Sequence, residues 1–78
     1  MTPLAIEYLP ADRLTAWRRN PRTHSKKQVR QIAESIRTFG FTNPVLIDDD
    51  QTILAGHGRV EAARLIGLED IPCVRLSQ

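Results

Sequence analysis

The apolar residues of this chain follow two spacings, which divide it into helical and extended segments. The clearest helical spacing comes after Ser25, where apolar residues recur three and four positions apart on one face. These residues are Val29, Ile32, Ala33, Ile36 and Phe39. Ser25 and Gln28 have the spacing of a capping box, and Gly40 provides a C-terminal stop. The pattern predicts an amphipathic helix that begins after Ser25 and ends at Gly40.

Short apolar runs on either side of this helix predict strands. The expected strands are Ala5–Leu9, Val45–Ile47, Thr52–Ala55 and Ile71–Leu76. Pro10 stops the first strand, and residues 48–51 form the turn of a hairpin between the second and third. A second helical pattern runs from about Gly58 to Ile66 and ends at Gly67, and residues 11–17 are compatible with a helical turn. This order of strands and helices predicts a small α+β domain.

Length and composition narrow the class of protein. A chain of 78 residues has room for one domain, residues 1–78, which we expect to be part of a longer protein. Its net charge of +2 is compatible with nucleic-acid binding without demanding it. The single cysteine, Cys73, lies in a strand-like run, so we interpret it as a core residue in a reducing compartment. There is no signal-peptide pattern and no membrane-spanning run, which predicts a cytoplasmic protein with no membrane partner.

The most informative segment joins the third strand to the second helix and reads Gly56-His57-Gly58-Arg59. A glycine turn that opens a helix presents free backbone N–H groups, which favour an anion. A cation in the first helical turn opposes the helix dipole, so Arg59 is unfavourably placed unless a negative group lies beside it. The segment therefore predicts a phosphate-binding turn. The alternative is that Arg59 is a surface charge paired with Glu61 or Asp48.

The other polar residues of this helix also have ordinary alternatives. The His57 ring is able to donate to a phosphate or to act as an acid–base group near pH 7, so it is the candidate for a catalytic residue. The alternative is a ring that bonds the turn itself, and no second acid–base partner is evident nearby in the sequence. Glu61 and Arg64 are three positions apart, and we expect an ordinary surface ion pair between them.

The most cationic part of the chain is the loop before the first helix. Its cations are Arg18, Arg19, Arg22 and His24. The Asn20-Pro21 pair within it favours a turn or an extended conformation. We expect these cations to contact nucleic acid or to form the second side of the phosphate site, with Asn20 and the Thr23 hydroxyl contributing. The alternative is an exposed basic loop.

Three consecutive aspartates, Asp48 to Asp50, raise the question of a metal site. The turn lacks further ligands and the spacing of a calcium loop, so we interpret it as a solvated hairpin tip and predict no metal. The strand Thr52–Ala55 separates these aspartates from the glycine turn by about 13 Å, at about 3.3 Å per residue. The separation matters because phosphoryl transfer normally needs a metal held by carboxylates.

An ordered series of short motifs covers nearly the whole chain. The series is Asn20-Pro21-Arg22, Ser35-Ile36, Gly40-Phe41, Pro44-Val45, Gly56 with Arg59, Leu65-Ile66-Gly67-Leu68 and Ile71-Pro72. With these motifs, the chain from about Ile6 to Val74 resembles the N-terminal domain of the ParB partition proteins, which has the ParB/sulfiredoxin fold. The resemblance implies a mixed sheet with a central β-hairpin and two main helices. Residues 22–25 and the glycine turn resemble ParB-like modules that precede DNA methyltransferases in phages and bacteria.

The resemblance also implies a nucleotide site. The ParB turn reads Gly-Glu-Arg-Arg-x-Arg-Ala and wraps the triphosphate of CTP; Gly56, Arg59 and Ala62 match it, and His57, Gly58 and Glu61 depart from it. The sulfiredoxin turn reads Gly-Cys-His-Arg-x-Glu-Ala; here His57 replaces its cysteine, so sulfinic acid reduction is not expected. The implied cofactor is a nucleoside triphosphate, CTP or ATP with Mg. The implied contacts are Gly56, His57, Gly58, Arg59, Asn20, Arg22 and Thr23.

Two classes of function stay open at this point. In the first, the chain is a nucleotide- or DNA-phosphate-binding module that regulates a DNA-modifying or partition protein, with downstream domains and a second copy as partners. In the second, it is a phosphoryl-transfer enzyme or a nuclease, and by resemblance nucleotide hydrolysis stays open too. The small size and the lack of paired carboxylates in the glycine turn favour the first class. No helix-turn-helix is present, so sequence-specific DNA reading is not predicted.

Overall fold

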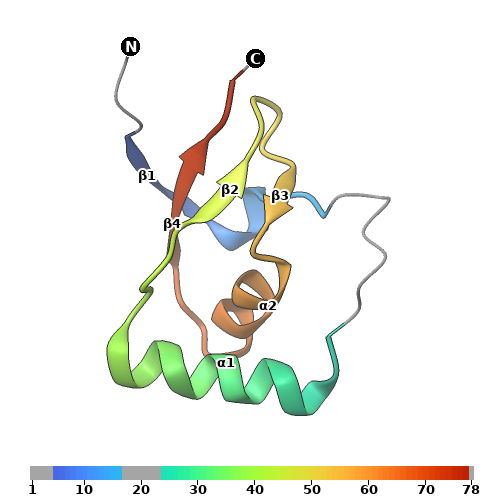
Figure 1. Ribbon diagram of the computed structural model, residues 1–78, viewed down its shortest axis with the longest axis vertical. Helices are drawn as coiled ribbons and strands as arrows, with labels where there is room; N and C mark the ends of the chain where they lie inside the picture. Colours follow the sequence, from blue (N-terminus) through green and yellow to red (C-terminus); the bar gives the residue numbers. More distant parts are fainter. Residues whose placement is uncertain (1–4, 17–23, 78) are drawn as a thin grey trace.

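The computed structural model describes residues 5–16 and 24–77, and it contains a sheet with two helices (Figure 1). The strands are β1 (Ile6–Pro10), β2 (Val45–Ile47), β3 (Ile53–Ala55) and β4 (Asp70–Arg75). The helices are α1 (Lys26–Phe39) and α2 (His57–Leu65), and a short 3-10 turn, η1, covers Ala11–Arg13. These elements confirm the predicted α+β class, and each predicted strand and helix is found within one residue of its expected start.

The sheet is mixed, with the strand order β1-β4-β2-β3. Strand β4 pairs antiparallel with β1 and parallel with β2, while β2 and β3 form an antiparallel hairpin. The hairpin is central in the chain, but its second strand, β3, lies at the edge of the sheet. Pro10 belongs to β1, opposite Asp70, rather than stopping before it. A proline is tolerated there because β1 is an edge strand.

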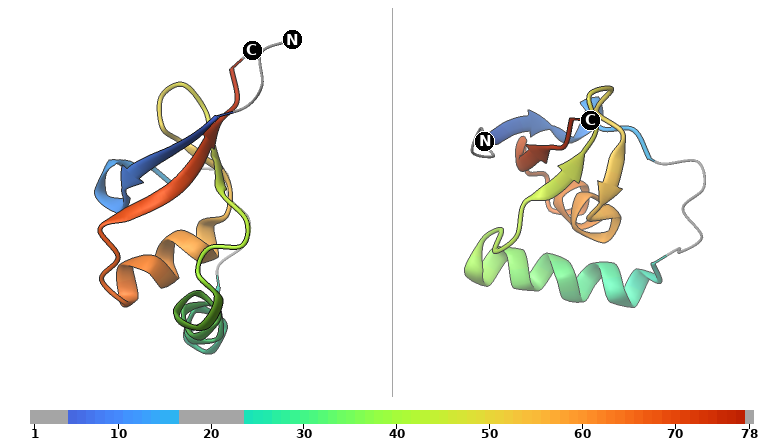
Figure 2. Two further views of the ribbon diagram at one scale, coloured as in Figure 1. Left: turned by 90° about the vertical axis from the view of Figure 1, so that its left-hand side faces the viewer. Right: turned by 45° about the horizontal axis from the view of Figure 1, so that its top comes forward.

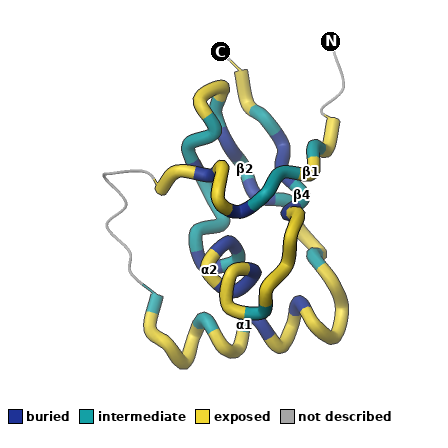
Figure 3. Tube along the Cα trace, turned by 180° about the vertical axis from the view of Figure 1, so that it is seen from behind, coloured by how far each residue is buried: buried dark blue, intermediate teal, exposed yellow. Residues whose placement is uncertain are grey.

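Both helices lie on one side of the sheet, as the edge-on view shows (Figure 2). Helix α2 packs against the sheet, and α1 packs against α2. One core cluster joins sheet and α2 residues, including the fully buried Val45, Ile47 and Ile71. A second, smaller cluster joins the two helices through Ala33, Ile36 and Ala62. The buried stretches therefore lie on the sheet and α2, whereas α1 is buried on one face (Figure 3).

The sequence predicts the N-terminus of helix α1 correctly, but it is wrong about the burial of Phe39 at the C-terminus. The predicted capping box is confirmed: the Ser25 side chain accepts from the Gln28 N–H at 3.1 Å, and Gln28 Oε1 accepts from the Ser25 N–H at 3.0 Å. Phe39, expected on the buried face, is instead 75% exposed. Helix α1 lies crosswise to α2 (Figure 2), and the cluster that joins the two helices takes its α1 residues from between Val29 and Ile36, so Phe39 lies beyond this contact.

Cys73 is fully buried in β4, which confirms its assignment to the core. Burial raises the pKa of its thiol, and the negative charge of Glu7 raises it further, while Arg75 opposes both. The neutral thiol is therefore favoured, which is the opposite of what a nucleophile needs. In the described part of the chain, neither helix has the length and apolar character to cross a membrane.

Candidate phosphate-binding site

The turn that opens α2 depends on glycine at position 56. Gly56 is the N-terminal cap of the helix and has a φ of 106°, a conformation that side chains disfavour. A Cβ atom there would lie 2.9 Å from Arg59 Nη2 and 3.2 Å from Val45 Cγ2. Backbone conformation and close packing therefore both require a glycine. Helix α2 begins at His57, one residue before the predicted start.

Gly58 is the point where the beginnings of the two helices meet. A Cβ atom on Gly58 would lie 2.9 Å from His24 Nε2 and 2.9 Å from Ile32 Cδ1. His24 directly precedes Ser25, the N-terminal cap of α1. The N-terminus of α1 therefore approaches the N-terminus of α2 through the His24 ring, which brings two positive dipole ends together.

Neither helix offsets this positive potential with an acid in its first turn. The first turn of α1 instead carries Lys26 and Lys27, and that of α2 carries Arg59. Cations at these positions are unfavourable in the absence of an anion, by a few tenths of a kcal/mol to about 1 kcal/mol each at exposed sites. The arrangement of both helices thus favours a negative ligand between them.

A cavity of about 320 Å³ opens at this junction. Its lining residues are His24, Ile32, Leu54, Ala55, Gly56, His57, Gly58 and Arg59. Of the expected site residues, four from the glycine turn are thus brought together with His24, which the sequence placed in the basic loop. No carboxylate belongs to this lining, so a phosphate would meet only cations, backbone and apolar groups among the described residues.

Arg59 does not make either of the ion pairs considered from the sequence. Within residues 5–16 and 24–77, the ion pairs are Arg37–Glu34 and Arg75–Glu7. The Arg59 Nη2 donates instead to the Pro44 carbonyl at 3.2 Å, which ties the start of α2 to the start of β2. This contact spans 15 residues and was not predicted, because nothing in the local sequence signals it.

The Nε of Arg59 is buried and has no hydrogen-bond partner among the described residues. A charged donor that is removed from water without an acceptor is costly. In the described part of the chain it is the one buried side-chain polar atom left in this state. Because Arg59 lines the cavity, an acceptor that enters the cavity beside it would supply what is missing.

The electrostatics of His57 reflect its position beside His24. Burial lowers the pKa of His57, the positive charge of His24 lowers it further, and Glu61 opposes both. The ring is therefore more often neutral near pH 7 than a solvent-exposed histidine. These two residues are the only histidines in the chain, and both line the same cavity.

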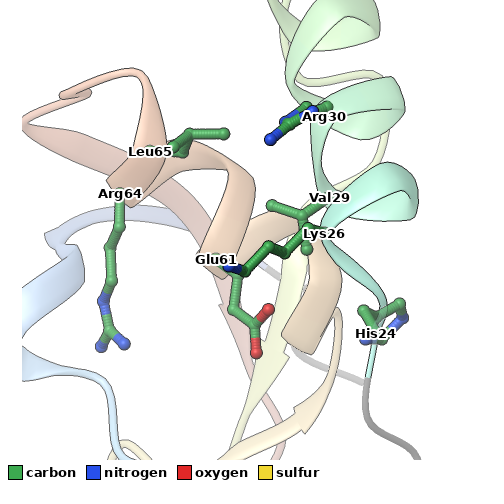
Figure 4. Close-up of a pocket in the computed structure, with 7 residues that line it drawn as sticks. All are labelled: His24, Lys26, Val29, Arg30, Glu61, Arg64 and Leu65. Carbon is green, nitrogen blue, oxygen red and sulfur yellow. The ribbon is translucent and has the colours of Figure 1, made fainter.

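A second cavity of about 470 Å³ lies between α1 and α2 and shares His24 with the first. Figure 4 shows Lys26 and Arg30 extending from α1 and Glu61 and Leu65 from α2. Arg64 points away from this cavity, toward η1. It donates to the carbonyls of Ala11 at 2.9 Å and Leu14 at 3.3 Å, so the expected Glu61–Arg64 ion pair is wrong.

The three aspartates lie at the far end of the β2–β3 hairpin from the glycine turn (Figure 1). Asp48 Oδ1 accepts from the backbone N–H groups of Asp50 and Thr52, both at 2.9 Å. This confirms the hairpin-tip interpretation. The length of β3 therefore lies between these carboxylates and the glycine turn.

Several predicted contacts lie outside the described residues. They are Arg18, Arg19, Asn20, Arg22 and Thr23. Whether Arg22 and Arg59 face one cavity therefore stays a prediction. The described site consists of the glycine turn and His24.

The mixed sheet, with a glycine turn that opens a helix beneath it, defines a small α+β domain whose candidate site is this turn. The family model of the ParB N-terminal domain matches residues 3–76, so the chain belongs to this family.

Curated relatives agree with this assignment. The chain is 50% identical over 74 residues to the ParB-like nuclease domain-containing protein YnaK of Escherichia coli K12, covering 95% of this chain and 85% of the relative. It is 32% identical to the nucleoid occlusion protein of Bacillus thuringiensis, covering 88% of this chain but only 26% of that protein. The chain thus corresponds to about a quarter of the longer relative.

Solved structures show the same fold. The chromosome-partitioning protein ParB of Caulobacter crescentus, complexed with CTP-gamma-S, superposes with a TM-score of 0.84 at 26% identity, over 95% of this chain and 45% of that chain. Sulfiredoxin of Arabidopsis thaliana gives a TM-score of 0.82 at 25% identity, over 95% and 86%. These neighbours confirm the predicted ParB/sulfiredoxin fold.

Proposed function

We propose that the chain is a phosphate-binding regulatory module, and that the cavity at the start of α2 holds the phosphates of a nucleoside triphosphate. The observation that carries this proposal is Arg59, which has a buried, unpartnered Nε and lines a cavity that lacks carboxylates among the described residues. The arginine offers its remaining N–H groups to phosphate oxygens, and the two helix N-termini add to the attraction.

The ligand is CTP or ATP in this proposal. Support comes from the ParB neighbour, whose structure contains CTP-gamma-S. The Gly56–Arg59 turn has the position that the family resemblance assigns to the triphosphate. Magnesium would be carried by the phosphate oxygens, because no carboxylate lines the cavity among the described residues. Asn20, Arg22 and Thr23 complete the site from the preceding loop.

The proposal extends to the whole protein through its relatives. The chain resembles a partitioning protein and a nucleoid occlusion protein, so DNA is the proposed macromolecular partner. Arg18, Arg19, Arg22 and His24 are the proposed DNA contacts. A second copy of the chain and downstream domains are the other proposed partners, and a place ahead of a DNA methyltransferase is the proposed context.

The second candidate is a nuclease or phosphoryl-transfer enzyme, which the name of the Escherichia coli relative suggests. The structure offers this candidate less support. The hairpin aspartates lie at the opposite end of β2 and β3, where the Asp48 carboxylate bonds the turn backbone. Glu61 is the carboxylate nearest in sequence to the glycine turn. His57 is its candidate acid–base group, and DNA cleavage or nucleotide hydrolysis would be its readout.

The test is a titration of the ¹⁵N-labelled chain with CTP, ATP, inorganic triphosphate and a short DNA duplex, followed by NMR. We expect triphosphates to shift the amides of Gly56 and Gly58 and the side-chain Nε–H of Arg59. Gly40 and Gly67 serve as internal controls, because both lie away from the cavity. Shifts confined to those two glycines, or no shifts at all, would refute the phosphate site.

The same samples separate the two candidates. A regulatory module binds the nucleotide and leaves DNA intact on prolonged incubation with Mg. Cleavage of the duplex that His57→Gln abolishes would favour the enzyme instead.

A further inference from the structure

The chain has two histidines, and the fold brings both to one cavity from segments 33 residues apart. His24 precedes α1 and His57 begins α2. Between them lies Gly58, where even a methyl group would collide with the His24 ring. The close approach of the two helix N-termini therefore places the His24 ring against Gly58, next in sequence to His57.

The charge of His24 acts on the protonation of His57 in this small cavity. When His24 is charged, it disfavours a proton on His57, and partial burial acts in the same direction. Arg59 adds a fixed positive charge in the same lining, and Lys26 and Arg30 add two more around the adjoining cavity that shares His24. Glu61, four residues after His57, is the negative group that partly offsets them.

An anion placed between the two rings opposes the effect of these positive charges and favours protonation of the histidines. Each negative charge on the ligand lowers the cost of protonating a histidine, so binding draws protons onto the pair. A ligand group with two negative charges has a stronger effect than a group with one. Terminal phosphates carry between one and two charges near neutral pH, whereas each phosphodiester of a nucleic-acid strand carries one.

We propose that His24 and His57 form a proton-coupled anion site that selects a doubly charged terminal phosphate over a phosphodiester. This inference rests on the proposed phosphate site and adds two properties to it: binding takes up protons, and it tightens as the pH falls. The site thus belongs to the end of a nucleotide or of a phosphorylated chain. The inference therefore assigns His24 to this site and leaves Arg18, Arg19 and Arg22 as the proposed DNA contacts.

Sulfate is the appropriate probe, because it keeps both charges across the pH range in which histidine titrates. Calorimetric titrations of the unmodified chain with sodium sulfate at pH 8.0 and pH 6.0, at constant ionic strength, give the two affinities. Full linkage of one proton strengthens binding by about tenfold per pH unit, so we expect at least a severalfold gain at pH 6.0. Repeating the titration in two buffers of different ionisation enthalpy measures the protons taken up.

Three comparisons make the test specific. Dimethyl phosphate, a monoanionic diester, should bind more weakly and take up fewer protons than sulfate. His24→Gln and His57→Gln should each reduce the pH dependence, and the double variant should remove it. Arg37→Gln is the matched control, since Arg37 is exposed and pairs with Glu34 on α1.

The possible failures are distinguishable. Sulfate binding without proton uptake, or with equal affinity at both pH values, overturns the proton-coupled site and leaves the phosphate site standing. Sulfate binding at neither pH overturns the phosphate site itself and the coupling with it. Because proton uptake is measured on the unmodified chain, the result does not depend on the folding of any variant.

Discussion

The two ends of the β2–β3 hairpin both carry charged side chains, but these side chains differ in how their hydrogen-bonding groups are paired. At the tip, residues 48–51, the Asp48 carboxylate accepts two backbone N–H groups, and Arg75 donates to the carbonyls of Asp48 and Asp49. At the glycine end, residues 56–59, Arg59 makes one hydrogen bond and leaves its Nε unpartnered. The hydrogen bonds of Asp48 and Arg75 at the tip indicate a structural role, whereas the unpartnered donor at the glycine end is the feature on which the proposed ligand site rests.

The largest effect is expected at the glycine end, from Gly56→Ala. The alanine backbone must adopt a φ of 106°, which side chains disfavour. In addition, its Cβ would lie 2.9 Å from Arg59 Nη2. We expect unfolding free energy to fall by roughly 2–4 kcal/mol, measured by urea denaturation. Gly67→Ala is the control, because Gly67 also has a positive φ but open space around it, so it should lose only about 1–2 kcal/mol. Equal losses would mean that packing against Arg59 is unimportant.

Arg59→Ala should separate ligand binding from folding. We expect triphosphate affinity to weaken by about 1.5–3 kcal/mol, the range for a charge-assisted hydrogen bond. Unfolding free energy should fall as well, by about 1 kcal/mol, because the bond to the Pro44 carbonyl is lost. Calorimetry with inorganic triphosphate and a thermal melt give the two values. Lysine at this position should restore binding only in part, since it lacks the planar fork.

Asp48→Ala tests the other end of the hairpin. It removes the acceptor of two backbone N–H groups, so we expect a loss of about 1–2 kcal/mol in unfolding free energy. Triphosphate affinity should stay unchanged, because β2 and β3 separate the tip from the cavity. A weaker affinity in Asp48→Ala would contradict the division of roles between the two ends.

The smallest effect is the pH dependence of stability without ligand. Because the pKa of His57 is lower in the folded chain than the usual 6.5, its contribution is present above about pH 6.5 and is lost as the pH falls through the folded value. The melting temperature should therefore decrease from pH 7 to pH 5, and less steeply in His57→Gln. Sulfate should reduce this decrease in the unmodified chain. Parallel curves for the two proteins would show that His57 does not contribute.

The sequence predicted those features that depend on neighbouring residues. The capping box at Ser25, the hairpin turn at Asp48 and the glycine at position 56 all follow from chemistry within four residues. Burial of Cys73 followed from the apolar strand around it.

Long-range contacts gave no such signal. Arg59 reaches the Pro44 carbonyl and Arg64 reaches the carbonyls of η1, and backbone acceptors have no distinguishing residue type to recognise in a sequence. The approach of His24 to Gly58 was missed for a related reason. In a sequence, a glycine required by close packing cannot be distinguished from one required by a turn. Of Gly56 and Gly58, only Gly56 has a positive φ. Exposure of Phe39 depends on how α1 crosses α2, which periodicity alone does not reveal.

The pairing of β1 with β4 has a practical consequence for protein engineering. Ile6 stands opposite Val74, so the first and last strands run side by side, and adjacent strands are about 4.8 Å apart. A unit whose entry and exit points are neighbours can be grafted into a surface loop of a host protein with short spacers at each junction. The glycine turn follows the opposite end of the hairpin from its tip, so a fluorescent reporter joined near residue 77 would leave the cavity open. If the proposed phosphate site is confirmed, the same geometry suits the domain to use as an anion sensor within a host protein.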